Sequence, residues 1–311
     1  MKLINMVTMK HDMKAILGEE FFKEEVRCDY RISETQKMIW AMELDLYLVF
    51  EEICRKYGLK YFVMFGSLLG AIRHHGFIPW DDDIDVAMPR KDYDVFMKVA
   101  PQELKEPYAL QCPYTYPNCY ITNITLRNSM GTFTSKRFKT LDYNKGMPLD
   151  IFPLDYCNPD TLIQDQEKIL EHILRCSSWM NLQMPGLTQE EIDKYKKHKT
   201  DDPLHDWEMI QRIASNLAHE GSEFMVQTVV MLKRWYGTVS PLLRTEWFDE
   251  TVMHPFETIG VSIPSQWDKV LCKLYGDNYM QFPPLQERGS INDSLIVDPF
   301  TPYKEYDFSE Q

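Results

Sequence analysis

The first strong pattern along the chain predicts an amphipathic helix over residues 34–57. Ser33-Glu34-Thr35-Gln36 has the form of a capping box, in which side chains satisfy the free amides of a helix start. Gly58 is suited to end the helix. Apolar residues recur at intervals of three and four, at Ile39, Met42, Leu46, Val49, Ile53 and Tyr57. This stripe predicts packing on a core rather than a binding site.

Shorter apolar patterns then predict two strands with a helix between them. Residues 61–65 form a continuous apolar run typical of a buried strand, and Gly66-Ser67 ends it before an expected helix over 68–73. A loop with Gly and Pro covers 74–79. Residues 83–88 alternate between polar and apolar, as a half-buried strand does.

The following segment predicts a helix and several more strands. The helix is expected from Lys91 to about Val99, because Pro101 disfavours helical geometry at the residue before it. The further strands are expected near residues 108–112, 120–127, 131–134 and 147–152.

The pattern changes after this strand-rich segment. Helical spacing dominates from about 160 to 250, with a polar interruption near 188–206. We therefore predict an α/β (α+β) fold with a β-sheet core and flanking helices. Its parts are an N-terminal extension (1–33), a catalytic core (34–156) and a mainly helical C-terminal region (157–311) packed on that core.

Composition limits the classes of function. The formal net charge of -13 disfavours a nucleic-acid partner, because a polyanion is repelled by such a surface. The N-terminus is too polar for a signal peptide, and no run of about 18 uncharged apolar residues suggests a membrane span. Seven cysteines without a Cys-x-x-Cys pair favour free thiols over a zinc site. A cytoplasmic location is therefore expected.

Three aspartates spaced by two residues carry the clearest chemical signal. Asp81, Asp83 and Asp85 would share one face of a strand, because side chains two positions apart do so. Carboxylates on one face repel each other unless a cation lies among them. Their oxygens suit magnesium, with manganese as the alternative. In isolation, an Asp-x-Asp pattern is more often a solvated acidic loop or a calcium site.

Gly66 and Ser67 favour the metal interpretation. They stand where an apolar strand gives way to a helix start, so a phosphate can approach the backbone and its free amides. A Gly-Ser pair followed by Asp-apolar-Asp is typical of metal-assisted phosphoryl transfer. We therefore predict Asp83 and Asp85 as catalytic metal ligands, and Gly66 and Ser67 as donor-binding residues.

Asp150 is the third predicted catalytic metal ligand, because an unpaired carboxylate on an apolar strand is costly. Asp155 could share the role, but a turn or capping role is expected for it. Arg73 and Arg127 are predicted to bind donor phosphates, with a salt bridge or an exposed position as the alternative for each.

Asp81 and Trp80 are expected to support the metal ligands from behind. For Trp80 we favour packing under the metal loop over a place in the wall of an aromatic box for a quaternary ammonium group.

A family resemblance rests on these motifs. The run from Phe65-Gly66-Ser67 to Trp80-Asp81-Asp82-Asp83-Ile84-Asp85-Val86 resembles the signature of the LicD family. That family is related to the fukutin-type phosphotransferases and belongs to the nucleotidyltransferase superfamily. Leu149–Asp155 resembles its second block. Segments 256–257, 261–264 and 275–284 resemble its closing block.

The resemblance implies a nucleotidyltransferase-type core with a mixed sheet. It also implies transfer of phosphocholine, or a similar phosphoalcohol, from a cytidine diphosphate donor such as CDP-choline. The acceptor would be a cell-surface glycan precursor, as in lipopolysaccharide or teichoic acid modification, and the enzyme would associate with membrane-bound glycan intermediates.

Two other functions remain open. The same metal site would serve a nucleotidyltransferase that moves a nucleoside monophosphate to a small molecule. A non-catalytic protein that binds divalent ions would show no turnover with any nucleotide. Segment 160–245 matches no block of the family, so the acceptor is not identified from the sequence.

Overall fold

The computed structural model describes residues 9–112, 114–116, 123–175, 188–190, 193, 197, 201–217, 222–226, 241–289 and 294–310. Its helices are α1 (Met13–Leu17), α2 (Glu34–Tyr57), α3 (Phe65–His74), α4 (Arg90–Glu103), α5 (Leu162–Arg175), α7 (Pro203–Leu217) and α9 (Trp267–Tyr275). Its strands are β1 (Glu25–Arg27), β2 (Tyr30–Ile32), β3 (Phe62–Val63), β4 (Asp85–Pro89), β5 (Tyr108–Gln111), β6 (Ile124–Asn128), β7 (Thr132–Ser135), β8 (Met147–Cys157), β9 (Phe224–Val226), β10 (Leu243–Arg244), β11 (Thr251–Phe256), β12 (Ile259–Pro264) and β13 (Leu295–Asp298). The predicted α/β class with a mixed sheet is confirmed.

Strand β8 is the centre of the seven-stranded sheet. Its first part pairs in parallel with β4 on one side and antiparallel with β6 on the other. Its last residues pair with β9, so a strand from the C-terminal half extends the same sheet. A long strand with different partners along its length fixes the relative positions of segments far apart in sequence.

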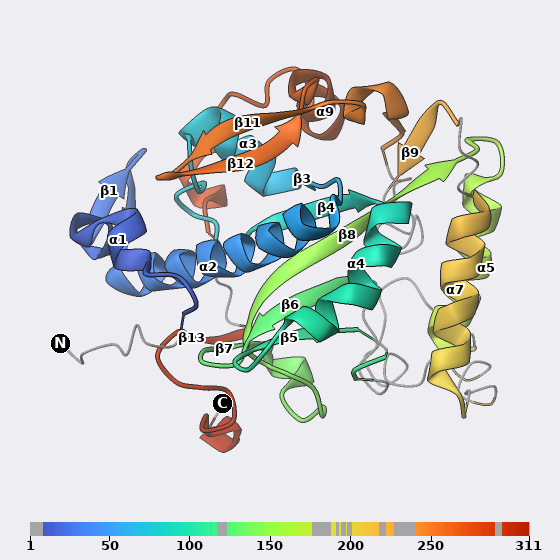
Figure 1. Cartoon of the computed structure of the whole chain (residues 1–311), viewed down its shortest axis with the longest axis horizontal. Coiled ribbons are helices and arrows are strands. Elements are labelled where there is room, and N and C mark those ends of the chain that lie inside the picture. Colours follow the sequence, from blue (N-terminus) through green and yellow to red (C-terminus); the bar gives the residue numbers. More distant parts are fainter. Residues whose placement is uncertain are drawn as a thin grey trace.

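Helix α2 follows its predicted bounds. The Ser33 hydroxyl accepts a hydrogen bond from the Gln36 amide at 3.2 Å, and Gly58 closes the helix in a left-handed conformation with a φ of 65°. The apolar face of α2 packs on β6 and β8, next to α4 (Figure 1). Five residues of the predicted stripe are buried (Ile39, Met42, Leu46, Val49 and Ile53), whereas Tyr57 is 39% exposed. Trp40, Leu44 and Phe50 lie outside that stripe and are fully buried too, so α2 is buried on more than one side.

A second layer lies beside β3 and β4. The hairpin β11–β12 and helix α9 contact α3 and β3, and Figure 1 shows them together along one edge of the molecule. Helices α5 and α7 pack against each other at the far side. One hydrophobic cluster runs from Met13 to Tyr279 and joins these layers.

Several predicted boundaries were wrong. Strand β3 is shorter than residues 61–65, and helix α3 begins at Phe65 rather than at 68, so Gly66 and Ser67 lie in its first turn rather than before it. Strand β4 begins at Asp85 rather than residue 83. Helix α4 continues past Pro101 to Glu103, because the Ala100 carbonyl still accepts a hydrogen bond from the Leu104 amide. Strand β8 is longer than residues 147–152.

The described part of the C-terminal half contains short strands as well as the helices α5, α7 and α9. Strands β9 to β13 have few residues and therefore give little periodic signal. Residues 120–122 of the strand predicted near 120–127 lie outside the described residues, as do residues 191–192, 194–196 and 198–200 of the polar interruption near 188–206. In the described part of the chain, no helix is both long and apolar enough to cross a membrane.

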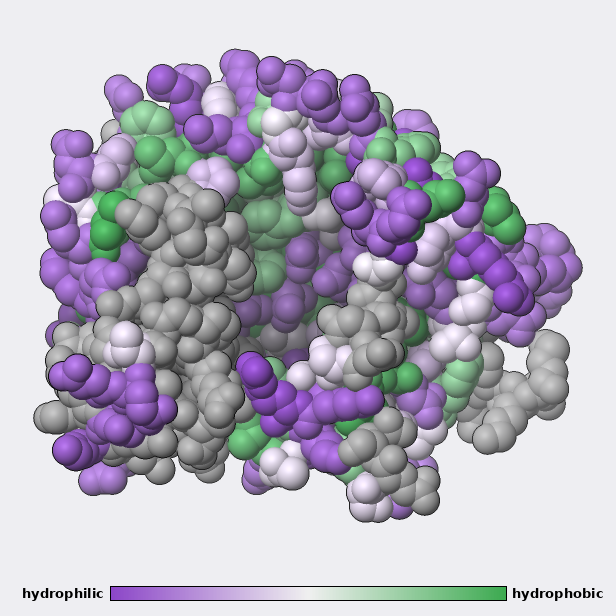
Figure 2. Space-filling view, turned by 180° about the vertical axis from the view of Figure 1, so that it is seen from behind, coloured by the Kyte–Doolittle hydropathy of each residue, from purple (hydrophilic) through white to green (hydrophobic). Residues whose placement is uncertain are grey.

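The face opposite that of Figure 1 has a hollow near its centre. Hydrophilic side chains occupy the recess, and hydrophobic ones line its upper side (Figure 2). Cys28, Cys54, Cys112, Cys157 and Cys272 are free thiols. Cys119 and Cys176 lie outside the described residues.

Asp155 was expected at a turn or cap, but it lies in β8 and is fully buried. The Arg90 guanidinium binds it with two hydrogen bonds, from Nε to Oδ1 at 2.6 Å and from Nη2 to Oδ2 at 2.9 Å. The pair connects the start of α4 to the point where β8 passes from β4 to β9. Asp155 therefore has a structural partner in Arg90 and is not part of the acidic group around Asp85.

We predict that Arg90→Met lowers the free energy of unfolding by about 3–5 kcal/mol, because it leaves the Asp155 carboxylate buried without its cation. Replacing both residues, as Arg90→Met with Asp155→Leu, should recover much of this loss. Urea unfolding of the two variants measures the difference. Equal stability of the single and double variants would contradict this role for the ion pair.

Candidate active site

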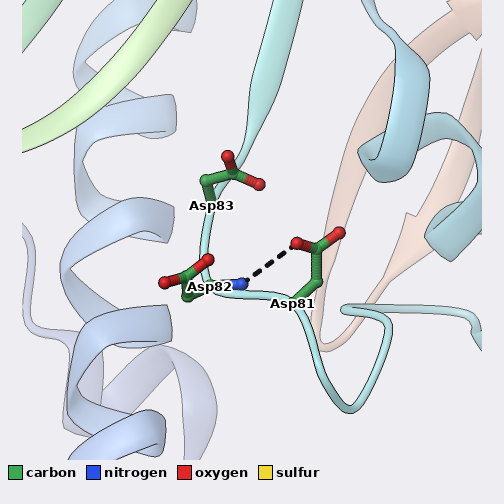
Figure 3. A group of neighbouring side chains, drawn as sticks. All are labelled: Asp81, Asp82 and Asp83. Atoms are coloured by element: carbon green, nitrogen blue, oxygen red, sulfur yellow. Dashed lines mark hydrogen bonds between the residues drawn. The ribbon is translucent and has the colours of Figure 1, made fainter. Parts of the chain in front are cut away.

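Asp81, Asp82 and Asp83 form a compact acidic loop before β4. One carboxylate oxygen from each lies within 4.8 Å of those of the other two, and the Asp82 amide donates to Asp81 Oδ1 at 3.3 Å (Figure 3). Burial alternates through this extended segment: Asp82 and Ile84 are buried, whereas Asp81, Asp83 and Asp85 are half-buried. The two-residue spacing thus keeps the three predicted aspartates on the more open side, although only Asp85 belongs to a strand.

Asp85 and Asp150 lie side by side because their strands pair in register. Asp85 of β4 is the Cα partner of Asp150 of β8, which is in turn the partner of Thr125 of β6. Residues in register share a face of the sheet, so the three side chains form one row across three strands. The Thr125 hydroxyl donates to Asp150 Oδ1 at 2.7 Å, which fixes the orientation of this carboxylate.

Burial and, after it, the charges of neighbouring carboxylates disfavour the ionised form of these aspartates. Burial raises the pKa of Asp85 well above its ordinary value, and the charge of Asp150 adds to the effect. Burial, followed by the charges of Asp85 and Asp81, does the same for the pKa of Asp83. The pKa of Asp82 rises to about 6 through burial and the charge of Asp81. Such a set of oxygen ligands fits a hard divalent cation, which would remove the repulsion.

Helix α2 holds the acidic loop from one side. Gln36 Nε2 and Trp40 Nε1 both donate to the Asp81 carbonyl, at 2.7 and 2.8 Å. Trp40 is stacked on Phe77 with ring centroids 4.6 Å apart, so the indole has little freedom. The backbone position of the loop is therefore set by a helix that the sequence analysis assigned to packing alone.

The start of α3 holds the loop from the other side. The Ser67 hydroxyl accepts a hydrogen bond from the Asp85 amide at 2.8 Å. A Cβ added at Gly66 would come within 2.8 Å of Asp81 Oδ2, so glycine allows this carboxylate to lie against the helix start. Both residues thus contact the aspartates, and their binding of donor phosphate stays a prediction.

Glu257, in the turn between β11 and β12, fixes the loop that leads to the aspartates. Its carboxylate accepts two hydrogen bonds from Arg27, at 2.6 and 3.0 Å, and one from the Phe77 amide at 3.2 Å. Its own amide donates to the His75 carbonyl at 2.7 Å. A Cβ at Gly76 would lie 2.2 Å from Glu257 Oε1, so this close approach requires glycine.

Arg73 is bound to the closing block of the chain. Its Nη1 donates to the carbonyls of Tyr279 and Gln281 at 2.9 and 3.0 Å, and its guanidinium lies over the rings of Trp80 and Phe282. Trp80 is only 9% exposed. Arg288, which the sequence analysis did not single out, lies 4.7 Å from the centre of the Trp80 ring. Trp80 is thus packed between cationic and aromatic side chains.

Arg127 is buried, and its guanidinium forms hydrogen bonds within the sheet region. Its Nε donates to Gln111 Oε1 at 2.7 Å, and its Nη1 donates to the Gly146 carbonyl at 2.9 Å. The register places Arg127 two residues from Thr125, on the same face of β6. Binding of donor phosphate by Arg73 and Arg127 stays a prediction, since the hydrogen bonds of both guanidinium groups are to other residues of the protein.

Two residues near the aspartates were missed in the sequence analysis. Tyr275 ends α9, and burial raises the pKa of its hydroxyl, with the charges of Asp85, Asp81 and Asp83 adding to the effect. Glu43 of α2 is fully buried beside Asp82 and Asp150. The only sequence signal for Glu43 was an acidic residue between the apolar Met42 and Leu44.

We predict that Gly66→Ala leaves the fold intact but weakens divalent-cation binding by about ten- to a hundredfold, because the new methyl group displaces the Asp81 carboxylate. Isothermal titration with MnCl2 measures the affinity, and thermal unfolding checks the fold. Gly289→Ala is the control, because a Cβ there has open space. An unchanged affinity in Gly66→Ala would contradict a role for Asp81 near the cation.

Thr125→Val should also weaken cation binding, by about tenfold, because it removes the hydrogen bond that orients Asp150. Thr125→Ser keeps the hydroxyl and should bind MnCl2 as the unaltered protein does. If valine and serine variants behave alike, the hydroxyl does not orient the carboxylate.

Comparison with known proteins agrees with this geometry. A family model described as LicD/FKTN/FKRP, nucleotidyltransferase domain, matches residues 58–172, which include every predicted site residue. Lipopolysaccharide cholinephosphotransferase LicD of Haemophilus influenzae is 26% identical over 259 residues, covering 77% of this chain and 89% of that protein. An uncharacterized protein of Rickettsia typhi is 36% identical over 91 residues, which cover 28% of its length. The segment that matches the LicD/FKTN/FKRP family model thus contains the acidic site, and the similarity to the H. influenzae protein extends over most of the chain.

Proposed function

We propose that this protein is a phosphotransferase that moves phosphocholine, or a similar phosphoalcohol, from a cytidine diphosphate donor to a hydroxyl of a cell-surface glycan precursor. The observation that carries the proposal is the row of Asp85, Asp150 and Thr125 beside the acidic loop. The relative from H. influenzae is named as a lipopolysaccharide cholinephosphotransferase, which supports the choice of transferred group and acceptor class.

Magnesium fits the residues present. Asp83, Asp85 and Asp150 would hold it, with Asp81 and Asp82 adjacent, and all of these are hard oxygen donors. When bound, the cation neutralises charge on the diphosphate and on the departing nucleotide. Two carboxylates from neighbouring strands are well suited to this task, since the sheet register keeps them in place without a cation.

The transfer step can be written with its atoms balanced. The acceptor hydroxyl oxygen forms a bond to the phosphorus that bears the alcohol, while the bond from that phosphorus to the bridging oxygen breaks. The bond's electron pair leaves with cytidine monophosphate, and the hydroxyl proton passes to water. Gly66 and Ser67 would present the first turn of α3 to the diphosphate, as the N-terminal end of a helix favours anions.

Tyr275 and Arg73 would border the donor. The Tyr275 hydroxyl is within range of the charges of the aspartates and of Arg73. Arg73 Nη1 is engaged by two carbonyls, which fixes the guanidinium over Trp80 and Phe282. A guanidinium held in a fixed position is suited to bind a phosphate group of the donor.

The assay uses purified protein, CDP-choline and MgCl2, with a deacylated lipopolysaccharide or other glycan as acceptor. We expect release of cytidine monophosphate and a mass increase of the acceptor by one phosphocholine. Asp85→Asn should lower turnover by at least about a hundredfold, because it removes charge from the cation site. Asp160→Asn, at an exposed position, is the matched control.

Two outcomes would replace this proposal. Release of pyrophosphate from a nucleoside triphosphate, without use of CDP-alcohols, would show the nucleotidyltransferase alternative. Cation binding without turnover on any CDP-alcohol or nucleoside triphosphate would show a non-catalytic ion-binding protein.

A further inference from the structure

Glu43 is a buried carboxylate without a hydrogen-bond partner. It lies in the middle of α2 and is 0% exposed, and neither of its side-chain oxygens is hydrogen-bonded within the described residues. Leaving a carboxylate uncompensated in a protein interior is costly. A position of this kind on a core helix indicates a partner that the protein side chains do not supply.

The side chain of Glu43 lies beneath the acidic loop. Gln36, Trp40 and Glu43 follow the i, i+4, i+7 spacing of one helical face. Gln36 and Trp40 bind the Asp81 carbonyl. Glu43 lies one turn further along the same face of α2, so its side chain faces the acidic loop. Burial raises the pKa of Glu43 well above its ordinary value, and the charges of Asp82 and then Asp150 add to this.

Asp82 approaches Glu43 from the loop side. Figure 3 shows its carboxylate turned toward α2, whereas that of Asp81 points the opposite way. Asp82 Oδ2 is also buried without a hydrogen-bond partner among the described residues, and the whole residue is 7% exposed. The nearby amide of Ile84 lowers the pKa of Glu43 but does not complete a hydrogen bond with it.

We propose that Glu43 and Asp82 form an inner site for a divalent cation, between helix α2 and the acidic loop. It is separate from the site at Asp83, Asp85 and Asp150, and it does not depend on the proposed transferase activity. Magnesium and manganese are the fitting ions, since both take one or two carboxylates and complete their coordination with water. A cation there would bind the loop to the core helix.

The test counts bound manganese. Protein stripped with EDTA is titrated with MnCl2, and free Mn2+ is followed by electron paramagnetic resonance. We expect Glu43→Gln to bind one Mn2+ fewer per chain than the unaltered protein and to show a smaller rise in thermal midpoint with MnCl2. Asp82→Asn should lose the same equivalent, which covers the case in which Glu43→Gln does not fold.

Glu34→Gln is the control, because it makes the same change at the exposed start of the same helix. It should bind as many Mn2+ ions as the unaltered protein. Unchanged Mn2+ stoichiometry in both Glu43→Gln and Asp82→Asn would overturn the inner site and identify Glu43 as a neutral buried carboxyl.

Asp85→Asn separates this inference from the proposed function. If that variant loses Mn2+ and turnover while Glu43→Gln loses neither, the transferase site stands and the inner site fails. If Glu43→Gln loses one Mn2+ and the unaltered protein transfers nothing, the inner site stands and the transferase proposal fails. If the unaltered protein binds no Mn2+, both cation assignments fail.

Discussion

Repulsion among crowded carboxylates is the constraint around which the centre of this protein is arranged. Asp85 and Asp150 are neighbours in the sheet, and the acidic loop lies directly before Asp85. When water is excluded, the negative charge of one carboxylate strongly disfavours the ionisation of its neighbour. The arrangement persists because each carboxylate sits on backbone that is fixed for another reason, either by strand pairing or by hydrogen bonds from a packed helix.

The restraints on the acidic loop come from segments that are distant in sequence. Gln36 and Trp40 bind its backbone from α2, and Ser67 binds the start of β4 from α3. Glu257 holds the preceding loop from the hairpin β11–β12 and is itself held by Arg27 near the N-terminus. A site positioned by several independent elements keeps its geometry when any one of them moves slightly, as transfer chemistry requires.

Local sequence was sufficient to predict the parts of the site that lie within one segment. The caps of α2 and the spacing of Asp81, Asp83 and Asp85 depend on neighbours within a few residues. The helix start near Gly66-Ser67 was also predicted from local sequence, although α3 already begins at Phe65. Nothing local indicates that β8 pairs with β4 in a register that sets Asp150 beside Asp85. That pairing depends on sheet topology, so only the cost of a lone carboxylate on an apolar strand pointed to Asp150.

The same limit explains the residues whose contacts the sequence did not predict. Asp155 follows the motif of Asp150 closely, but its partner Arg90 lies 65 positions away and gives no local signal. The contacts of Arg73 with Tyr279 and Gln281 likewise join opposite ends of the chain.

The family model matches only part of the residues that surround the acidic site. Residues 58–172 contain both the sheet row and the acidic loop, whereas Glu43, Glu257 and Tyr275 lie outside that segment. The matched segment thus holds the charges that transfer chemistry needs, and the surrounding elements decide how those charges are placed and what borders them.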